Sequence, residues 1–211
     1  MNHRVGQLYE LLAGLPVCTA ETPSAALPSD GIYFFFEEGE RSEVAGTLVS
    51  RVVRVGTHKV DGRLPTRIRQ HFGNKNSLGG HKNGSVFRKH VGGALLRKQD
   101  LADSRLEEWI TQDGKSFPEV EEMVSRQLRS YFSFAWVPVP TKQERLSLES
   151  GLIALLAQHR AGSPSTGWLG HSAFDSAIAT SGLWNTQHLK SAVLSDVQLA
   201  ELRRLPETPR G

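Results

Sequence analysis

Arg67 and His71 are two residues whose types and spacing could act together on a phosphate group. They stand four residues apart in the stretch 64–72, whose apolar residues follow a helical spacing, so both side chains would project from the same side of a helix. A guanidinium forms bidentate contacts with phosphate oxygens, and an imidazole accepts or relays a proton. The pair is therefore suited to phosphate chemistry, although a solvent-exposed pair without a function would have the same spacing.

Glu149 is the carboxylate with the most informative position. The leucine and isoleucine residues of 146–156 cover about half of a helical wheel, and Glu149 falls near the middle of that apolar arc. Because an unpaired buried carboxylate is costly, Glu149 requires a cation or a set of hydrogen bonds. An arginine would meet this need, and so would a divalent metal at the mouth of a site. One carboxylate completed by water and a substrate phosphate suits Mg²⁺.

Tyr33 belongs to the apolar run 31–38, in which alternation places it on the opposite face of a strand from Ile32. Gly56 ends a second β-branched run, where a glycine permits close approach of the backbone to another group. Taken alone, a strand tyrosine is usually a core residue and such a glycine is usually a turn residue. A functional role for Tyr33 or Gly56 therefore depends on evidence from other residues of the chain.

The positive charge of the chain is concentrated in one segment. Residues 51–98 hold twelve Lys or Arg, four His and a single acid, Asp61, whereas residues 100–122 hold eight acids against Arg105 and Lys115. Such segregation favours a surface that faces a polyanion, while a solvated face on an ordinary protein is the plain alternative. Nucleic acid is the expected polyanion, because the basic residues alternate with Gly, Asn and Ser, which suit backbone approach to phosphates.

Several classes of protein are disfavoured by what the sequence lacks. The single cysteine, Cys18, excludes a disulfide framework and a cysteine-based zinc site. The four histidines between positions 58 and 90 lack the paired short spacing of zinc ligands, and no nucleotide-binding or hydrolase motif is present. Without a signal peptide pattern or an apolar run of membrane length, a cytoplasmic protein with no membrane partner is expected.

Helical and strand periodicities place these residues on expected elements. Helices are predicted over 4–14, 64–72, 85–98, two parts of 103–130, 142–159, 173–181 and 186–204, and strands over 31–38, 47–56 and 131–139. Residues 38–42 are predicted as the turn between the first two strands, and Thr141 as the cap of the helix that carries Glu149. The expected architecture is an α+β domain with a small antiparallel sheet and helices on it.

The chain resembles the GIY-YIG nuclease superfamily over about residues 29–190. The residues that carry the resemblance are, in chain order, Gly31-Ile32-Tyr33, Arg54-Val55-Gly56, Arg67-x-x-x-His71, Glu149 and Asn185. The resemblance implies a three-stranded antiparallel sheet flanked by helices and one divalent metal.

The resemblance also implies a role for each matching residue. Tyr33 would be the general base or would orient the attacking water, and His71 would support the tyrosine or the phosphate. Arg67 would stabilise the transition state, Glu149 would hold the metal, and Asn185 would brace the site. These roles agree with the chemistry expected for each residue type, since a Lewis acid polarises the phosphate and a phenol paired with a base takes a proton from water.

This sequence departs from the family pattern in two ways. Arg54 stands where the second motif usually has a tyrosine, and His58, two residues beyond Gly56, is a candidate to replace it as base or relay. In addition, residues 73–130 form a large insertion. Extra DNA contacts are expected from basic residues of the insertion and from the second motif, namely Lys75, Lys82, Arg88, Lys89, Arg97 and Arg54.

These inferences combine into one prediction of domain organisation and function. Residues 1–28 are expected to be an N-terminal helix and linker, and residues 29–205 a GIY-YIG-like nuclease domain. The predicted activity is that of a DNA endonuclease dependent on Mg²⁺ or Mn²⁺, and a homodimer would allow both strands to be cut. One alternative is a GIY-YIG-like domain that binds nucleic acid without cutting, and another is an unrelated α+β protein with a chance motif.

Overall fold

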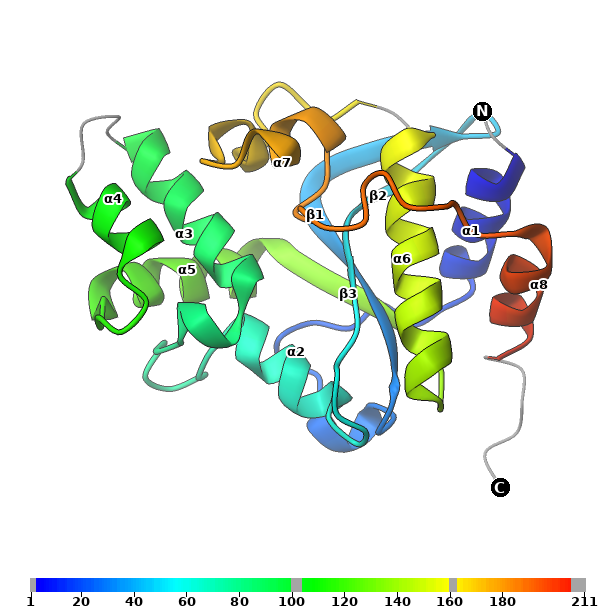
Figure 1. The fold of residues 1–211 in the computed structure, drawn as a ribbon, viewed down its shortest axis with the longest axis horizontal. Coiled ribbons are helices and arrows are strands. Elements are labelled where there is room, and N and C mark those ends of the chain that lie inside the picture. The colour runs from blue at the N-terminus through cyan, green and yellow to red at the C-terminus, as the bar shows by residue number, and fades with distance from the viewer. Residues whose placement is uncertain (1–2, 100–103, 160–162, 206–211) are drawn as a thin grey trace.

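The computed structural model describes residues 3–99, 104–159 and 163–205 (Figure 1). Its centre is a three-stranded antiparallel sheet in the order β2-β1-β3, which confirms the predicted fold class. The strands are β1 (Gly31–Val44), β2 (Thr47–Gly56) and β3 (Phe132–Pro138). Because β1 is central, β2 has one open edge, and this edge borders the site described below.

The turn between β1 and β2 differs from the prediction. Residues 38–42 were expected to form it, but β1 continues to Val44 and the chain turns at Ala45 and Gly46, with φ of 50° and 79°. Positive φ at both central positions is typical of a two-residue hairpin turn whose twist matches that of the strands. Gly39 also has a positive φ, of 83°, and it lies within a register shift of β1 instead of at the turn.

Eight α-helices of the described residues surround the sheet. Their bounds are α1 (His3–Ala13), α2 (Leu64–Phe72), α3 (Val86–Gln99), α4 (Ser104–Thr111), α5 (Pro118–Tyr131), α6 (Lys142–Gln158), α7 (Ser176–Ser181) and α8 (Asp196–Arg204). Thr141 caps α6 as predicted, accepting a hydrogen bond from the Glu144 backbone N–H. The last helix begins ten residues later than the predicted start at 186, because the Ser195 capping box fixes its first turn at Asp196. No helix in the described ranges is long and apolar enough to cross a membrane.

Alternation along β1 divides the interior into two cores, as the sequence predicts. Tyr33 and Phe35 face one core, which is completed mainly by α2, α3 and α5, whereas Ile32 and Phe34 face the other, which contains α1, α6 and α8. Figure 1 shows these two groups of helices on opposite sides of the sheet.

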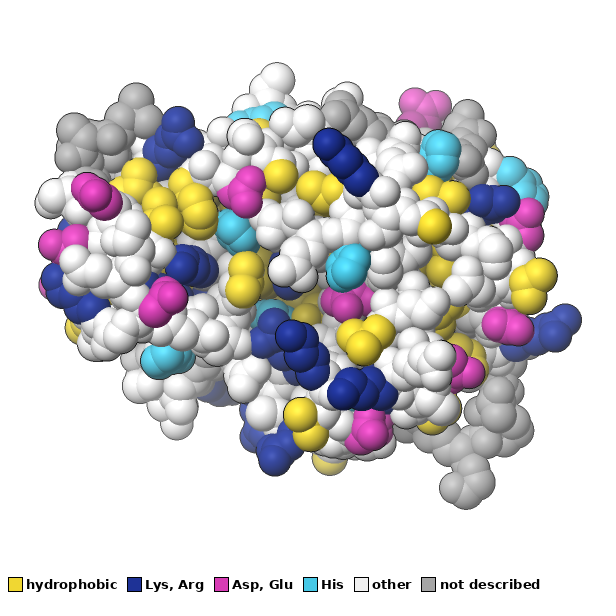
Figure 2. All heavy atoms as spheres, viewed as in Figure 1, with side chains coloured by type: hydrophobic (Ala, Val, Ile, Leu, Met, Phe, Trp, Pro, Cys, Tyr) yellow, Lys and Arg dark blue, Asp and Glu magenta, His cyan; other side chains and the backbone are white. Residues whose placement is uncertain are grey.

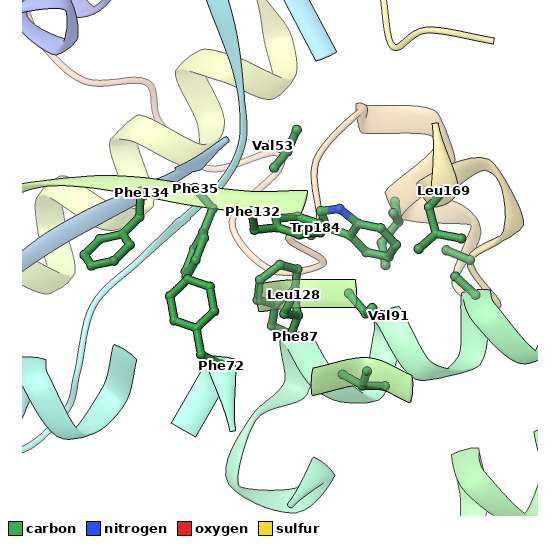
Figure 3. Close-up of a cluster of buried hydrophobic side chains, with 14 of the residues drawn as sticks. Phe35, Val53, Phe72, Phe87, Val91, Leu128, Phe132, Phe134, Leu169 and Trp184 are labelled. Atoms are coloured by element: carbon green, nitrogen blue, oxygen red, sulfur yellow. The ribbon is translucent and has the colours of Figure 1, made fainter. Parts of the chain in front are cut away.

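Aromatic packing anchors α2 and α3 to the first core. The ring of Phe35 lies 5.5 Å from that of Phe72 on α2 and 5.3 Å from that of Phe87 on α3, and Figure 3 shows these rings grouped on one face of the sheet. Edge and tilted arrangements of this kind are favourable for aromatic pairs. The position of α2 relative to the sheet is therefore set by the core, and α2 carries two of the predicted site residues.

Candidate active site

A cleft of about 960 Å³ opens beside the end of β2. Cationic side chains of Arg54, Lys59, Arg63 and Arg67 line it, and Glu149 is the single acid among the described residues of its wall. Figure 2 shows Lys and Arg side chains gathered at the centre of this face of the molecule. A pocket with this surplus of positive charge is suited to a phosphate backbone.

Tyr33 and His71 form a hydrogen-bonded pair directly beneath this region. The Tyr33 hydroxyl lies 2.7 Å from Nε2 of His71, and both residues are fully buried. Nδ1 of His71 lies 2.8 Å from Oγ of Ser85, which is also fully buried. Neither Tyr33 nor His71 lines the cleft, so the pair reaches it only through its neighbours.

His71 is kept neutral by its surroundings. Burial lowers the pKa of its imidazole well below the ordinary value, and the positive charges of Arg67, Arg54 and Arg88 lower it further. A neutral imidazole has one nitrogen that donates and one that accepts. The three guanidinium groups therefore create a site that disfavours a cation at His71 and favours negative charge.

Gly56 explains how Tyr33 fits against the sheet. The two residues are partners in the β1–β2 register, and a Cβ atom at position 56 would lie 2.3 Å from the Tyr33 hydroxyl oxygen. Any side chain at this position would push the phenol away from its hydrogen-bonding place. Position 56 thus requires glycine because the Tyr33 ring approaches it closely. Backbone conformation is not the reason, since the φ angle of Gly56 is not positive.

Arg54 connects the buried pair to the cleft. Its guanidinium lies 5.0 Å from the centre of the Phe87 ring and donates to the Trp184 carbonyl at 2.7 Å, while its Nε has no hydrogen-bond partner among the described residues. Burial lowers the pKa of Arg54, and the neighbouring Tyr33 hydroxyl and Glu149 carboxylate counteract this effect. Arg54 also lines the cleft, whereas Tyr33 does not, so Arg54 connects the phenol to the cleft.

Arg67 lies on the cleft wall and belongs to α2, the helix predicted over residues 64–72. Its guanidinium donates to the Gly84 carbonyl at 2.5 Å and to the Gln70 side chain at 3.3 Å. These contacts hold the side chain across the loop before α3. It forms no ion pair with any residue in the described ranges, so its charge remains available to an anion.

Glu149 reaches the same cleft from α6, on the other side of the sheet edge. Its Oε1 accepts the backbone N–H of Thr57 at 3.1 Å. Burial raises the pKa of the carboxyl, whereas Arg54, the Thr57 N–H, His188 and Arg67 act in the opposite direction. The arginine partner considered from sequence is not found as an ion pair among the described residues.

The donors around Glu149 fit one kind of metal binding and not another. No group of three or more His, Cys, Asp or Glu side chains that could hold a metal occurs in the part of the chain that is described. A closed protein site of the zinc type therefore does not fit. Mg²⁺ usually retains several waters and binds through one or two carboxylates together with substrate phosphates, and a single carboxylate in a cationic cleft fits that mode.

Asn185 closes the open edge of β2. Its side-chain amide accepts from the Val55 N–H at 3.0 Å and donates to the Val55 carbonyl at 2.9 Å, as a neighbouring strand would. The backbone N–H of Trp184 donates to the Val53 carbonyl at 2.7 Å. Trp184 and Asn185 thus satisfy the backbone of the edge strand, and Asn185 also lines the cleft.

His58 does not have the free nitrogen that a base or relay requires. Its Nδ1 hydrogen-bonds to the Val60 carbonyl at 2.7 Å, which places a proton on Nδ1, and its Nε2 accepts the Gly31 N–H at 3.3 Å. Burial lowers the pKa of this imidazole, so the neutral form that makes both bonds is favoured. The expectation that His58 replaces the missing tyrosine is corrected: His58 holds the start of β1 to the loop after β2.

Two of the expected DNA-contacting residues lie inside the protein. Arg88 is fully buried and binds Glu121, with the closest atoms 2.6 Å apart. Lys82 is 3% exposed, and its ammonium donates to the carbonyls of Trp109 and Gln112 at the end of α4. These two expectations are corrected, because both charges are used to hold the insertion together.

Lys75, Lys89 and Arg97 remain at or near the surface. Lys75 pairs with Glu21, and Lys89 pairs with Asp113 at 3.0 Å. Arg97 donates to the Ala173 carbonyl at 3.1 Å. Of the six residues, Arg54 is the one that lines the cleft.

Ser85 is the participant that the sequence did not reveal. It caps α3, since its hydroxyl accepts the backbone N–H of Arg88 at 3.2 Å. A serine before an apolar periodic stretch is an ordinary helix signal, so its contact with His71 could not be distinguished from capping alone.

Comparison with known proteins gives one match. A family model described as the GIY-YIG domain matches residues 3–207. No curated protein and no solved structure matches the chain.

Proposed function

The chain belongs to the GIY-YIG domain family, and we propose that it is a metal-dependent DNA endonuclease that hydrolyses phosphodiester bonds in the cleft beside β2. The observation that carries the proposal is the meeting of three elements at one cleft. Arg54 comes from β2, Arg67 from α2 and Glu149 from α6, and all three line it. Such a combination of guanidinium groups with one carboxylate supports phosphodiester chemistry.

In this proposal the two arginines bind and stabilise the phosphate. Arg67 is held at the cleft wall by Gly84 and Gln70, so its donors are oriented before the substrate arrives. A preorganised guanidinium stabilises the negative charge that grows on the phosphate oxygens in the transition state. Arg54 neutralises the same charge from the inner side of the cleft.

Glu149 is the residue that would hold Mg²⁺ or Mn²⁺. The bound ion would supply a positive charge for the phosphate and the leaving oxygen. Thr57 orients the carboxylate through its backbone N–H, so the geometry of the ligand depends on the end of β2. Burial raises the pKa of Glu149, and a nearby cation would favour its ionised form.

Tyr33 is the group that would orient the attacking water or accept its proton, and in the second case the hydroxyl hydrogen of Tyr33 would pass to Nε2 of His71. In the hydrolysis, the water oxygen bonds to phosphorus, the bond from phosphorus to the leaving oxygen breaks, and that oxygen takes a proton from solvent. One water molecule is consumed, and a phosphomonoester and an alcohol form. His71 orients the Tyr33 oxygen, since the two lie 2.7 Å apart.

One observation favours a second candidate, a domain that binds DNA without cutting it. Tyr33 is fully buried and does not line the cleft. Cutting therefore requires Arg54 to shift toward the phosphate so that water reaches the phenol. Binding alone requires no such movement.

A nicking assay separates the two candidates. Supercoiled plasmid is incubated with the protein and Mg²⁺ or Mn²⁺, with EDTA as the metal-free control. Glu149→Ala and Tyr33→Phe should abolish nicking, whereas Glu201→Ala, which removes an exposed acid from α8, should not. DNA binding without nicking on plasmid, branched or single-stranded substrates would favour the binding domain instead.

A further inference from the structure

Two histidines line the described wall of the cleft, His58 and His188, and they are held in different ways. His58 uses both ring nitrogens for hydrogen bonds within the fold. Nδ1 of His188 lies 3.2 Å from Oγ of Ser150 and 3.4 Å from Oγ of Ser191, whereas its Nε2 has no hydrogen-bond partner among the described residues. Nε2 of His188 is therefore the histidine nitrogen that this wall leaves for a ligand.

The loop that carries His188 is fastened to α6. The contact with Ser150 comes from this helix, and the side-chain amide of Gln158, farther along it, donates to the Ser191 carbonyl at 2.9 Å. Figure 1 shows this loop crossing α6 on its way from α7 to α8. Because α6 also carries Glu149, the helix and the loop present the carboxylate and the imidazole to the cleft together.

The backbone at His188 is in the left-handed region, with a φ of 64°. Residues other than glycine rarely adopt this conformation, although histidine does so more often than most. The conformation costs free energy and persists where surrounding contacts fix it, frequently at ligand sites. The contacts with α6 and with the two serines fix it here, so the ring is oriented before a ligand arrives.

His188 and His71 differ in the charges that act on them. Three guanidinium groups surround His71 and oppose a proton gained there. A positive charge at His188 instead attracts the Glu149 carboxylate and lowers its pKa. The two serines also suit a protonated ring, because a hydroxyl oxygen can accept from Nδ1–H, and both serines are partly exposed, so water can accept their own hydrogens.

His188 and Tyr33 approach the cleft from opposite faces of the sheet. Tyr33 faces the core that contains α2, whereas α6, which holds the His188 loop, packs in the other core. An in-line displacement at phosphorus places the attacking and the leaving oxygens on opposite sides. When water attacks from the side of Tyr33, the leaving oxygen therefore faces the side of His188.

We propose that His188 is a catalytic residue that donates a proton from Nε2 to the leaving oxygen of the phosphodiester. As the bond from phosphorus to this oxygen breaks, its electron pair stays on the oxygen, which takes the proton. His188 is cationic before the step and neutral after it, and it regains a proton from solvent. This role rests on the proposed nuclease function, in which it makes His188 the direct source of a proton that comes ultimately from solvent.

A DNA substrate with sulfur in place of the leaving oxygen tests this role, because a thiolate is a weak base and leaves without a proton. The sulfur is placed at a position that the wild-type protein nicks, and all reactions contain Mn²⁺. His188→Asn removes the imidazole, and asparagine tolerates a positive φ. This variant should cut the oxygen substrate about 10²-fold more slowly, as expected for loss of a general acid, and the sulfur substrate at nearly the wild-type rate.

The control is His81→Asn, at an exposed residue outside the cleft wall, which should cut both substrates at the wild-type rates. Equal losses on the two substrates in His188→Asn would overturn the proposal, because a residue that only binds phosphate or only holds the loop affects both alike. An unchanged rate on the oxygen substrate would overturn it as well.

Nitrogen NMR of the protein labelled with ¹⁵N-histidine separates this proposal from the nuclease function. A short DNA duplex is added in EDTA, and the two variants assign the signals of His188 and His81. Saturating DNA should shift Nε2 of His188 and leave the His81 signals in place. An unmoved Nε2 signal would overturn the proposal even for an active nuclease. A shifted signal in a protein that nicks no DNA would overturn the nuclease function and the proton transfer, and would support a phosphate contact alone.

Discussion

The cleft beside β2 and the helical insertion formed by α3, α4 and α5 are both rich in Lys and Arg, but they use this charge in opposite ways. In the insertion the cations meet acids: Arg88 binds Glu121, and Arg126 binds Glu122 at 2.7 Å. In the cleft, Arg54, Lys59, Arg63 and Arg67 form no ion pair with a described residue.

This difference shows why a count of basic residues does not locate a binding surface. A guanidinium that is paired and buried stabilises the fold, and its removal leaves an unpaired charge behind. A guanidinium that is oriented but unpaired remains available to a phosphate. The following predictions test this division between the two regions, from the largest expected effect to the smallest.

Arg88→Ala should reduce the free energy of unfolding by about 3–5 kcal/mol, because it leaves the buried Glu121 carboxylate without its cation. Chemical denaturation measures this change. Arg126→Ala is the matched control in the same insertion, and its exposed pair with Glu122 should be worth about 0.3–0.5 kcal/mol. A loss at Arg88 as small as that at Arg126 would show that the buried pair does not stabilise the insertion.

Arg67→Ala should lower the cleavage rate about 10²–10³-fold, as expected for loss of one oriented donor to the transition state. Thermal stability and most of the DNA affinity should remain, since several cations share the phosphate contacts. Single-turnover cleavage and equilibrium binding at one fixed salt concentration measure the two effects. Arg69→Ala, on the exposed side of the same helix, is the control. Equal loss of rate and affinity at Arg67 would make it a docking residue.

Glu37 is a buried carboxylate that is held by neutral hydrogen-bond donors instead of by a cation. Its Oε2 accepts the indole N–H groups of Trp168 and Trp184 at 2.8 Å and 3.1 Å, and burial raises its pKa to about 7. A folded pKa above the ordinary value of 4.5 means that the folded state binds more protons between these two pH values.

Stability should therefore fall as pH rises from about 4.5 to about 7, with a contribution from Glu37 of about 3 kcal/mol. Unfolding free energies of the wild-type protein and Glu37→Gln across this range measure the effect. The difference between the two proteins should change with pH in this direction. A constant difference would mean that Glu37 is ionised in the folded protein throughout.

The association constant for DNA should fall less steeply with salt concentration when the charges of Lys59 and Arg63 are both removed. The magnitude of the slope of log K against the logarithm of the salt concentration should decrease by about 2, since each phosphate contact contributes about one. The control is the pair Lys115→Ala and Arg126→Ala, whose side chains are bound to acids in the insertion. A similar decrease of the slope in the control would show that the insertion also contacts DNA.

Much of the fold and part of the site follow from local patterns. The alternation of β1 predicts which core Tyr33 faces, and the spacing of 64–72 predicts the helix of Arg67 and His71. The predicted positions of the hairpin turn and of the start of α8 were wrong, because both depend on the conformation of a few residues rather than on periodicity. Ala45, which has no strong turn preference, adopts a positive φ beside Gly46.

Sequence alone determined the faces of the strands, the family motifs and the excess of positive charge between 51 and 98, because each is a property of neighbouring residues along the chain. Tertiary structure alone decided which of these charges are neutralised. It turned Arg88 and Lys82 inward, engaged both nitrogens of His58, and placed Ser85 behind His71. The physical reason is that a charge or a proton is assigned by the partners that surround it, and these partners come from parts of the chain that only folding brings together.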